Sequence, residues 1–123
     1  MNPQKRILVV EDEKPIAKAL ELKLTHSGFD VTVAGDGENA LEISLHRNFD
    51  LILLDLIMPK MDGFEVLTKL KERHSNIPII VTSNLGQKED MEKVKELGAI
   101  EYFVKSNTPI ATIVNYIKNK LEA

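Results

Sequence analysis

The sequence contains no cysteine. Without this residue the chain cannot build a disulfide framework, a cysteine zinc site, an iron–sulfur cluster or a thiol nucleophile. It also lacks an excess of positive charge, since 16 lysines and arginines stand against 19 acidic residues and give a net charge of −3. This mildly acidic balance offers no electrostatic footprint for nucleic acid.

Long hydrophobic stretches are also missing. The longest uninterrupted apolar runs are Ile7–Val10 and Leu51–Leu54, whereas a helix needs about 20 apolar residues to cross a bilayer. The run before Glu11 is too short for the core of a signal peptide. Neither a P-loop nor a glycine-rich dinucleotide fingerprint is present. We therefore expect a cytoplasmic protein that binds neither membranes nor nucleic acid directly.

The 123 residues have an ordinary globular composition, with 43% apolar and 28% charged residues. A chain of this length buries roughly two-thirds of its unfolded surface, so its core needs no metal or disulfide for stability. It has no internal repeat, low-complexity segment or linker. We therefore expect one domain over residues 1–123, with no effector domain.

Short apolar runs alternate with amphipathic stretches along the chain. Runs that are apolar without interruption are typical of strands buried on both faces of a parallel sheet. The second run instead alternates from Asp30 to Val33, as expected for an edge strand. The predicted strands are Ile7–Val10, Val31–Ala34, Leu51–Leu54, Ile79–Val81 and Tyr102–Val104.

Five helices are predicted between and after these strands. Pro15 suits a first helical turn, Asp62 suits an N-cap, and Thr108 followed by proline marks the start of the last helix. The predicted helices are a segment from Pro15 to Gly28, Glu38–His46, a segment after Gly63, Lys88–Leu97 and a segment that begins at Thr108.

Five strands alternating with five helices predict an α/β fold of the (βα)₅ type. Right-handed crossovers then give a doubly wound parallel sheet with helices on both faces. Functional groups in such folds gather where the strands end, near the point at which the strand order reverses. The polar residues directly after the predicted strands are Glu11, Asp12, Glu13, Asp55, Thr82, Ser83 and Lys105.

Several carboxylates, one hydroxyl and one ammonium would meet at this edge if the first, third, fourth and fifth strands are neighbours. Carboxylates at that density raise one another's pKa, and they stay ionised together only around a cation. Oxygen ligands without histidine or cysteine favour Mg²⁺. Such a site suits a phosphoryl group, because the metal and the ammonium neutralise its oxygens and a carboxylate can be the nucleophile.

The chain resembles a response-regulator receiver domain of two-component signalling, of the single-domain type similar to the chemotaxis receiver. The resemblance covers residues 5–121. It rests on four segments, which are Ile7-Leu-Val-Val-Glu-Asp-Glu, Leu53-Leu-Asp-Leu-Ile-Met-Pro-Lys-Met-Asp-Gly, Val81-Thr-Ser and Tyr102-Phe-Val-Lys. The resemblance implies the flavodoxin-like strand order 2-1-3-4-5, of which the chemotaxis receiver is itself an example.

The resemblance implies a role for each residue of the site. Asp55 would accept the phosphoryl group from a sensor histidine kinase or phosphotransfer protein. Asp12 would bind Mg²⁺ directly, Glu11 would bind it through water, and the backbone carbonyl of Ile57 would complete the metal site together with Asp55. Lys105 would pair with Asp55 and then with the phosphoryl oxygens.

The resemblance also implies a switch. Thr82 would bond a phosphoryl oxygen after transfer, and Tyr102 would turn from an exposed to an inward position. The face of the fourth helix, fifth strand and fifth helix would then bind a downstream target protein. Phosphoryl transfer would be self-directed, followed by autodephosphorylation, so the chain would not be an enzyme that acts on other molecules.

The sequence departs from the family's pattern after Lys105. The next residue is Ser106, where many receivers have proline after a cis peptide bond. A cis bond before a residue other than proline costs about 3–4 kcal/mol. The bond is therefore either trans with a shifted loop or cis with tolerated strain, and we favour cis because the position of the Lys105 ammonium depends on this loop.

Three further positions bear on the site. Glu11 stands where aspartate is commoner, which changes the reach of the side chain more than its charge. Ile57 and Asn84 occupy positions that vary in the family. We hypothesise that the apolar side chain of Ile57 shields the phosphoryl group from water and lengthens its lifetime.

Each residue also has a structural interpretation. Asp55 could cap a loop, Thr82 could fill a strand, Lys105 could be a surface lysine and Tyr102 could be half-buried packing. We assign Glu13 only to a solvated turn before the first helix, where an acidic residue favours the helix dipole.

Three other functions compete with a phosphorylated receiver. A phosphate-independent binding module of the same fold is the main alternative, because of the departure at Ser106. A haloacid-dehalogenase phosphatase would need a second carboxylate at position 57. A flavodoxin-like electron carrier would need a phosphate-cradling loop where the chain has Glu11–Glu13. The apolar positions of the fifth helix suffice for core packing only, so we expect a monomer or a weak dimer.

Overall fold

The computed structural model of the chain describes residues 4–58, 62–73, 76–84 and 87–122. Within these ranges five strands form one sheet in the order β2-β1-β3-β4-β5, and every neighbouring pair is parallel. The predicted fold class and strand order are confirmed. The strands are β1 (Arg6–Val10), β2 (Asp30–Ala34), β3 (Leu51–Asp55), β4 (Ile79–Ser83) and β5 (Glu101–Val104).

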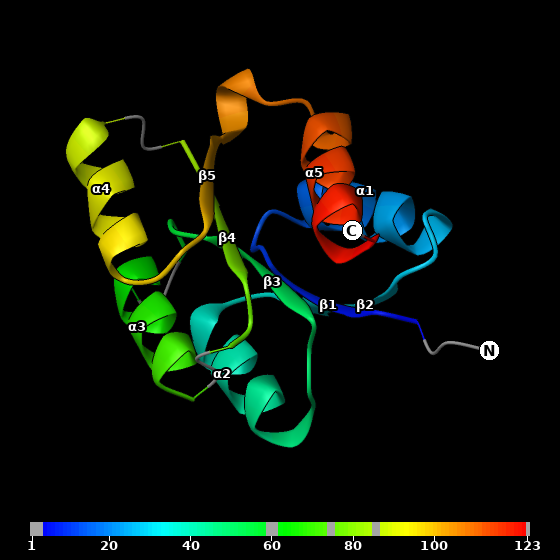
Figure 1. The fold of residues 1–123 in the computed structure, drawn as a ribbon, viewed down its shortest axis with the longest axis horizontal. Helices are drawn as coiled ribbons and strands as arrows, with labels where there is room; N and C mark the ends of the chain where they lie inside the picture. Colours follow the sequence, from blue (N-terminus) through cyan, green and yellow to red (C-terminus); the bar gives the residue numbers. More distant parts are fainter. Residues whose placement is uncertain (1–3, 59–61, 74–75, 85–86, 123) are drawn as a thin grey trace.

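Helices cover both faces of the sheet (Figure 1). One face carries α1 and α5, and the other carries α2, α3 and α4. The described helices lie within one or two residues of the predicted bounds. They are α1 (Lys14–His26), α2 (Gly37–His46), α3 (Gly63–Arg73), α4 (Lys88–Glu96) and α5 (Ile110–Glu122), with a 3₁₀ turn, η1 (Lys105–Asn107), before α5.

The apolar runs become central strands because alternate residues are buried on opposite faces. In β1, Ile7 and Val9 pack with the residues of α1 and α5, whereas Leu8 and Val10 pack with those of α2 and α3. Strand β2 lies at the edge and three of its five residues are only partly buried, as its alternating sequence predicts.

The start of α3 lies against the end of β3. Asp62 Oδ1 accepts a hydrogen bond from the amide of Phe64 (2.9 Å), which agrees with the predicted N-cap. A Cβ atom on Gly63 would overlap the backbone of Leu56, so only glycine fits this approach. Residues 59–61 of the same motif lie outside the described residues.

None of the described helices has the length and apolar character needed to cross a membrane.

Candidate functional site

Polar residues gather at the carboxyl edge of the sheet, where β1, β3, β4 and β5 end. Asp55 is the last residue of β3 and pairs in register with Thr82 of β4. Glu11 follows β1 directly, and its amide donates to the carbonyl of Ala34 (3.0 Å). Glu11, Asp55 and Thr82 are all buried, with 3–4% of their surface exposed. The strands therefore carry these polar groups into the protein interior.

Lys105 is the cation at this edge. Its Nζ atom lies 2.8 Å from Glu11 Oε1, 3.0 Å from Glu13 Oε2 and 3.2 Å from Asp55 Oδ2. The Lys105 side chain is only 12% exposed. One buried ammonium thus compensates carboxylates that come from the ends of two neighbouring strands.

Asp12 adds a further carboxylate to the cluster. Glu11, Asp12 and Asp55 each offer an oxygen within 4.8 Å of the others. Asp12 is exposed, while Glu11 and Asp55 are buried. An all-oxygen donor set with one face open to water fits Mg²⁺, which keeps part of its hydration shell in proteins. The residues present therefore fit the predicted metal.

Burial changes the charge balance of the site. Desolvation raises the pKa of Glu11 to about 7, although the hydrogen bond from Lys105 opposes the rise. Burial likewise raises the pKa of Asp55, against the hydrogen bond from the amide of Ile57. Burial alone would lower the pKa of Lys105, but its contacts with Glu11, Glu13 and Asp55 outweigh this effect and raise it. The ammonium therefore stays charged, and burial makes the charged forms of Glu11 and Asp55 harder to maintain.

A cavity of about 190 Å³ opens over these groups. It is lined by Asp12, Glu13, Asp55, Ile57, Asn84 and Lys105. The amide of Ile57 donates to Asp55 Oδ1 (3.1 Å), and 52% of the Ile57 residue surface is exposed. An apolar side chain therefore lies beside the Asp55 carboxylate.

Thr82 and Tyr102 are the two residues of the predicted switch. Thr82 lines a second cavity of about 180 Å³, which is otherwise mostly apolar and shares Glu11 and Lys105 with the carboxylate cluster. The ring of Tyr102 belongs to the core below α3 and α4 and is only 8% exposed. Burial raises the pKa of Tyr102, while a hydrogen bond with the Ser83 side chain lowers it. Tyr102 thus takes the inward of the two expected positions.

Two expectations about the loops are wrong. Of the two alternatives for the peptide bond between Lys105 and Ser106, the structure has the trans form and not the favoured cis form. The chain enters a 3₁₀ turn at Lys105, and the ammonium still reaches Asp55. Glu13 is also more than a residue of a solvated turn before α1. Although its side chain is 54% exposed, it is one of the carboxylates bound to Lys105.

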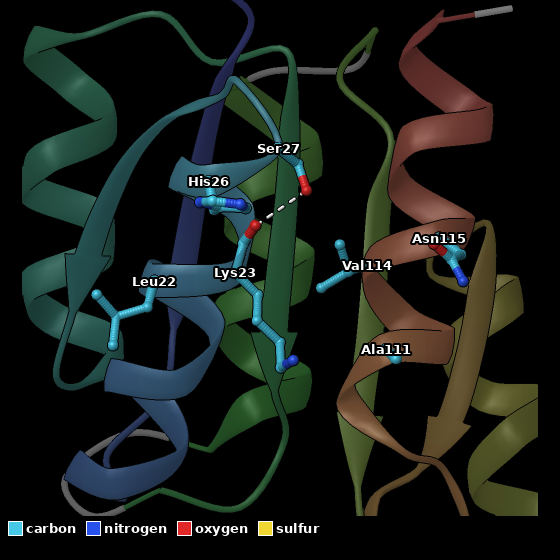
Figure 2. A pocket seen from close by; sticks show the side chains of 7 residues that line it. All are labelled: Leu22, Lys23, His26, Ser27, Ala111, Val114 and Asn115. Atoms are coloured by element: carbon cyan, nitrogen blue, oxygen red, sulfur yellow. Dashed lines mark hydrogen bonds between the residues drawn. The ribbon is translucent and has the colours of Figure 1, made fainter.

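A separate groove lies between α1 and α5 (Figure 2). Its volume is about 450 Å³, and it is lined by Leu22, Lys23, His26, Ser27, Ala111, Val114 and Asn115. Figure 2 shows the hydrogen bond from the Ser27 hydroxyl to the Lys23 carbonyl at its rim (2.9 Å). The groove contains none of the carboxylates, so it is not part of the candidate site.

Comparison with known sequences identifies the family. Residues 7–118 match the response regulator receiver domain. The chain belongs to this family. Among relatives, the receiver is 43% identical over 106 residues to the probable transcriptional regulator ycf27 of Cyanophora paradoxa, and 40% identical over 105 residues to the alkaline phosphatase synthesis transcriptional regulatory protein PhoP of Bacillus subtilis.

These alignments cover 86% and 85% of the chain but only 44% of each relative. The receiver therefore spans less than half the length of these transcriptional regulators.

Solved receiver structures agree with the fold. A CheY-like receiver domain protein from Methanospirillum hungatei superposes with a TM-score of 0.92 at 27% identity, covering 98% of this chain and 95% of that one. The response regulator TrrA from Thermotoga maritima, solved in complex with Mg²⁺ and BeF, gives a TM-score of 0.79 at 31% identity and covers 97% of both chains. The chain is thus a receiver domain of two-component response regulators.

Proposed function

We propose that this receiver accepts a phosphoryl group on Asp55, with Mg²⁺ bound beside it. The observation that carries the proposal is the contact between Lys105 and the buried Asp55 carboxylate, next to an acidic cluster whose oxygens are close enough together to hold a metal ion. A carboxylate that is buried, hydrogen-bonded and close to an ammonium is prepared to take on a doubly charged group.

The metal ligands would come from the acidic cluster. Asp12 and Asp55 would bind Mg²⁺ through their carboxylates, Glu11 would bind it through water, and Ile57 would supply its backbone carbonyl. When bound, Mg²⁺ neutralises the oxygens of the incoming phosphoryl group.

In the transfer step, a carboxylate oxygen of Asp55 attacks phosphorus. The bond between phosphorus and the donor histidine nitrogen breaks, and its electron pair stays on the imidazole, which takes up a proton from solvent. Lys105 then exchanges its contact with Asp55 for the new phosphoryl oxygens. The amide of Ile57 holds the other Asp55 oxygen throughout, so the carboxylate keeps its orientation.

The switch would use Thr82 and Tyr102. Thr82 lies beside Asp55 in the strand register, and its hydroxyl would bond a phosphoryl oxygen. The Tyr102 ring already lies against the core on the same side as α4, and a shift of Thr82 toward the phosphoryl group would leave space that favours this inward position. The face made by α4, β5 and α5 would carry this change to a downstream target protein.

The phosphoryl donor would be a sensor histidine kinase or a phosphotransfer protein in the cytoplasm. The recipient of the signal would be a downstream target protein. The named relatives are transcriptional regulators, which supports a role in signalling. We propose that the receiver meets these partners as a monomer or a weak dimer, through residues 1–123 acting as one domain.

Incubation with acetyl phosphate tests the proposal, with and without Mg²⁺, followed by a phosphate-affinity gel. We expect a Mg²⁺-dependent shifted band that Asp55→Asn abolishes. Asp62→Asn is the matched control, because it makes the same chemical change at a nearby exposed aspartate while keeping a residue that can cap α3.

Two results would overturn the proposal. A band that persists in Asp55→Asn would place the phosphoryl group elsewhere. No band in the wild-type protein, together with no change in its NMR spectrum on addition of beryllofluoride and Mg²⁺, would leave a phosphate-independent binding module of the same fold.

A further inference from the structure

One hydrogen bond joins the two loops that flank the candidate site. The backbone amide of Ser106 donates to Asn84 Oδ1 at 3.1 Å. Asn84 follows β4 directly, and Ser106 is the residue after Lys105. The bond therefore connects the loop that follows Thr82 to the loop that carries the Lys105 ammonium.

The bond depends on the departure of this chain from the commoner sequence. Proline has no backbone N–H, so a proline at position 106 could not donate. The first amides of a 3₁₀ turn have no carbonyl partner inside the turn, and Ser106 lies in the first positions of η1. The side chain of Asn84 supplies the acceptor from outside the turn.

Asn84 is also placed next to the reacting groups. It lines the same cavity as Asp55 and Lys105, and its side-chain oxygen holds the peptide unit that begins at Lys105. The ammonium end of Lys105 is bound by carboxylates. The hydrogen bond from Ser106 to Asn84 holds the backbone end of the same residue.

We propose that Asn84 is a positioning residue that fixes Lys105 for the phosphoryl group by binding the backbone amide of Ser106. This inference rests on the proposed function. A proline at position 106 would restrict the backbone after Lys105 through its ring. Asn84 restricts the same backbone through a hydrogen bond from the neighbouring loop. It acts through Lys105, without contact to the phosphoryl group.

Asn84→Ala tests this role, and Ser106→Ala is the matched control because it removes the serine side chain but keeps the amide donor. NMR titration with beryllofluoride in the presence of Mg²⁺ measures the affinity for a phosphoryl mimic. We expect Asn84→Ala to weaken binding about three- to tenfold, the factor that one lost hydrogen bond gives. Ser106→Ala should bind like the wild-type protein.

Two readouts without beryllofluoride separate positioning from a direct contact. Hydrogen exchange of the backbone amide at position 106 should accelerate in Asn84→Ala and not in Ser106→Ala. The NMR signal of the Lys105 ammonium should shift in Asn84→Ala before any ligand is added. The affinity for Mg²⁺ alone should be unchanged, since Asn84 is not part of the carboxylate cluster.

The outcomes distinguish the two proposals. If the wild-type protein responds to beryllofluoride and Asn84→Ala binds it equally well, the positioning role is overturned and the proposed function stands. If affinity falls while the Ser106 amide and the Lys105 ammonium signals are unchanged, Asn84 contacts the phosphoryl mimic directly and the positioning role is again overturned. A wild-type protein that does not respond overturns both.

Discussion

The apolar residues of β3 and the aspartate that ends this strand are both buried but differ in their chemical surroundings. Within β3, Leu51 to Leu54 have at most 1% of their surface exposed, and Asp55, the next residue, has 3%. The first four side chains belong to the two apolar cores that the helices cover on the two faces of the sheet. Asp55 meets an ammonium and a backbone amide.

This difference separates two kinds of burial. Apolar burial in the interior stabilises the fold under most solution conditions. Burial at the edge keeps charged groups in a low-dielectric surrounding, where their pKa values and contacts respond to protons, metal ions and neighbouring charge. We therefore expect different perturbations to reduce the stability of the fold and to change the chemistry of the candidate site.

The largest effect on stability should come from the interior. Leu67→Ala removes a fully buried side chain of α3, and we expect a loss of about 2–5 kcal/mol in the free energy of unfolding. Urea denaturation measures this loss. Leu22→Ala is the matched control, because Leu22 is 57% exposed on α1 and should change stability little. Phosphorylation by acetyl phosphate should survive in the folded fraction of Leu67→Ala, and its absence would show that the two regions are not separable.

The second largest effect on the free energy of unfolding should come from pH, through the titration of Glu11. The folded-state pKa of Glu11 is about 7, above its ordinary value of 4.5, so the folded protein holds this proton more tightly than the unfolded chain. The resulting stability is complete below pH 4.5 and is lost as the pH rises through 7. The shift corresponds to about 3 kcal/mol.

Urea denaturation between pH 4.5 and 8 in the presence of a chelator measures this dependence. Glu11→Gln is the control, because it keeps the shape of the side chain and cannot titrate. The difference in stability between the wild-type protein and Glu11→Gln should change across this interval. A constant difference would contradict the raised pKa.

Removal of the Lys105 ammonium should have a smaller effect on the free energy of unfolding. Lys105→Met leaves Glu11 and Asp55 buried without their ammonium partner. We expect a loss of about 1–3 kcal/mol at pH 8, below the 3–5 kcal/mol typical of a broken buried pair, because Glu11 can take up a proton. The loss should shrink at pH 6, and equal losses at both pH values would argue against this compensation. Lys120→Met, at an exposed position of α5, is the control.

The smallest effect should be a change in the lifetime of the aspartyl phosphate, with no change in stability. Ile57 is half exposed at the mouth of the cavity, so Ile57→Asn should leave stability unchanged. We expect the aspartyl phosphate to be lost severalfold faster, because a polar side chain admits water where the apolar one excludes it. The decay of the phosphorylated band after removal of acetyl phosphate measures this rate. Ile57→Leu, which stays apolar, should decay like the wild-type protein, and an unchanged rate in Ile57→Asn would count against shielding.

The interior and the strand ends could be predicted from the sequence, because they depend on patterns that the chain displays directly. Uninterrupted apolar runs predict buried parallel strands, and a parallel sheet brings the strand ends to one edge. The convergence of Glu11, Asp55 and Lys105 follows from this geometry together with the strand order. Gly63 could be understood only from the structure, which shows its approach to Leu56.

The loops could not be predicted in the same way. The trans bond after Lys105, the ion pair of Glu13 and the acceptor role of Asn84 all depend on loop conformation. Side chains in loops are not constrained by a period of 2 or 3.6 residues. Their contacts are set by the folded backbone, which the sequence pattern does not specify.

The distance along the chain between Asp55 and Lys105 has a consequence for protein synthesis. A chain grows from its N-terminus, so Glu11, Glu13 and Asp55 leave the ribosome well before Lys105, the lysine that binds all three. The same late segment supplies Ile113 and Ile117, which close the core over β1 and α1. We therefore expect the carboxylates and the lysine of the candidate site to come together in the same folding step that completes this part of the core.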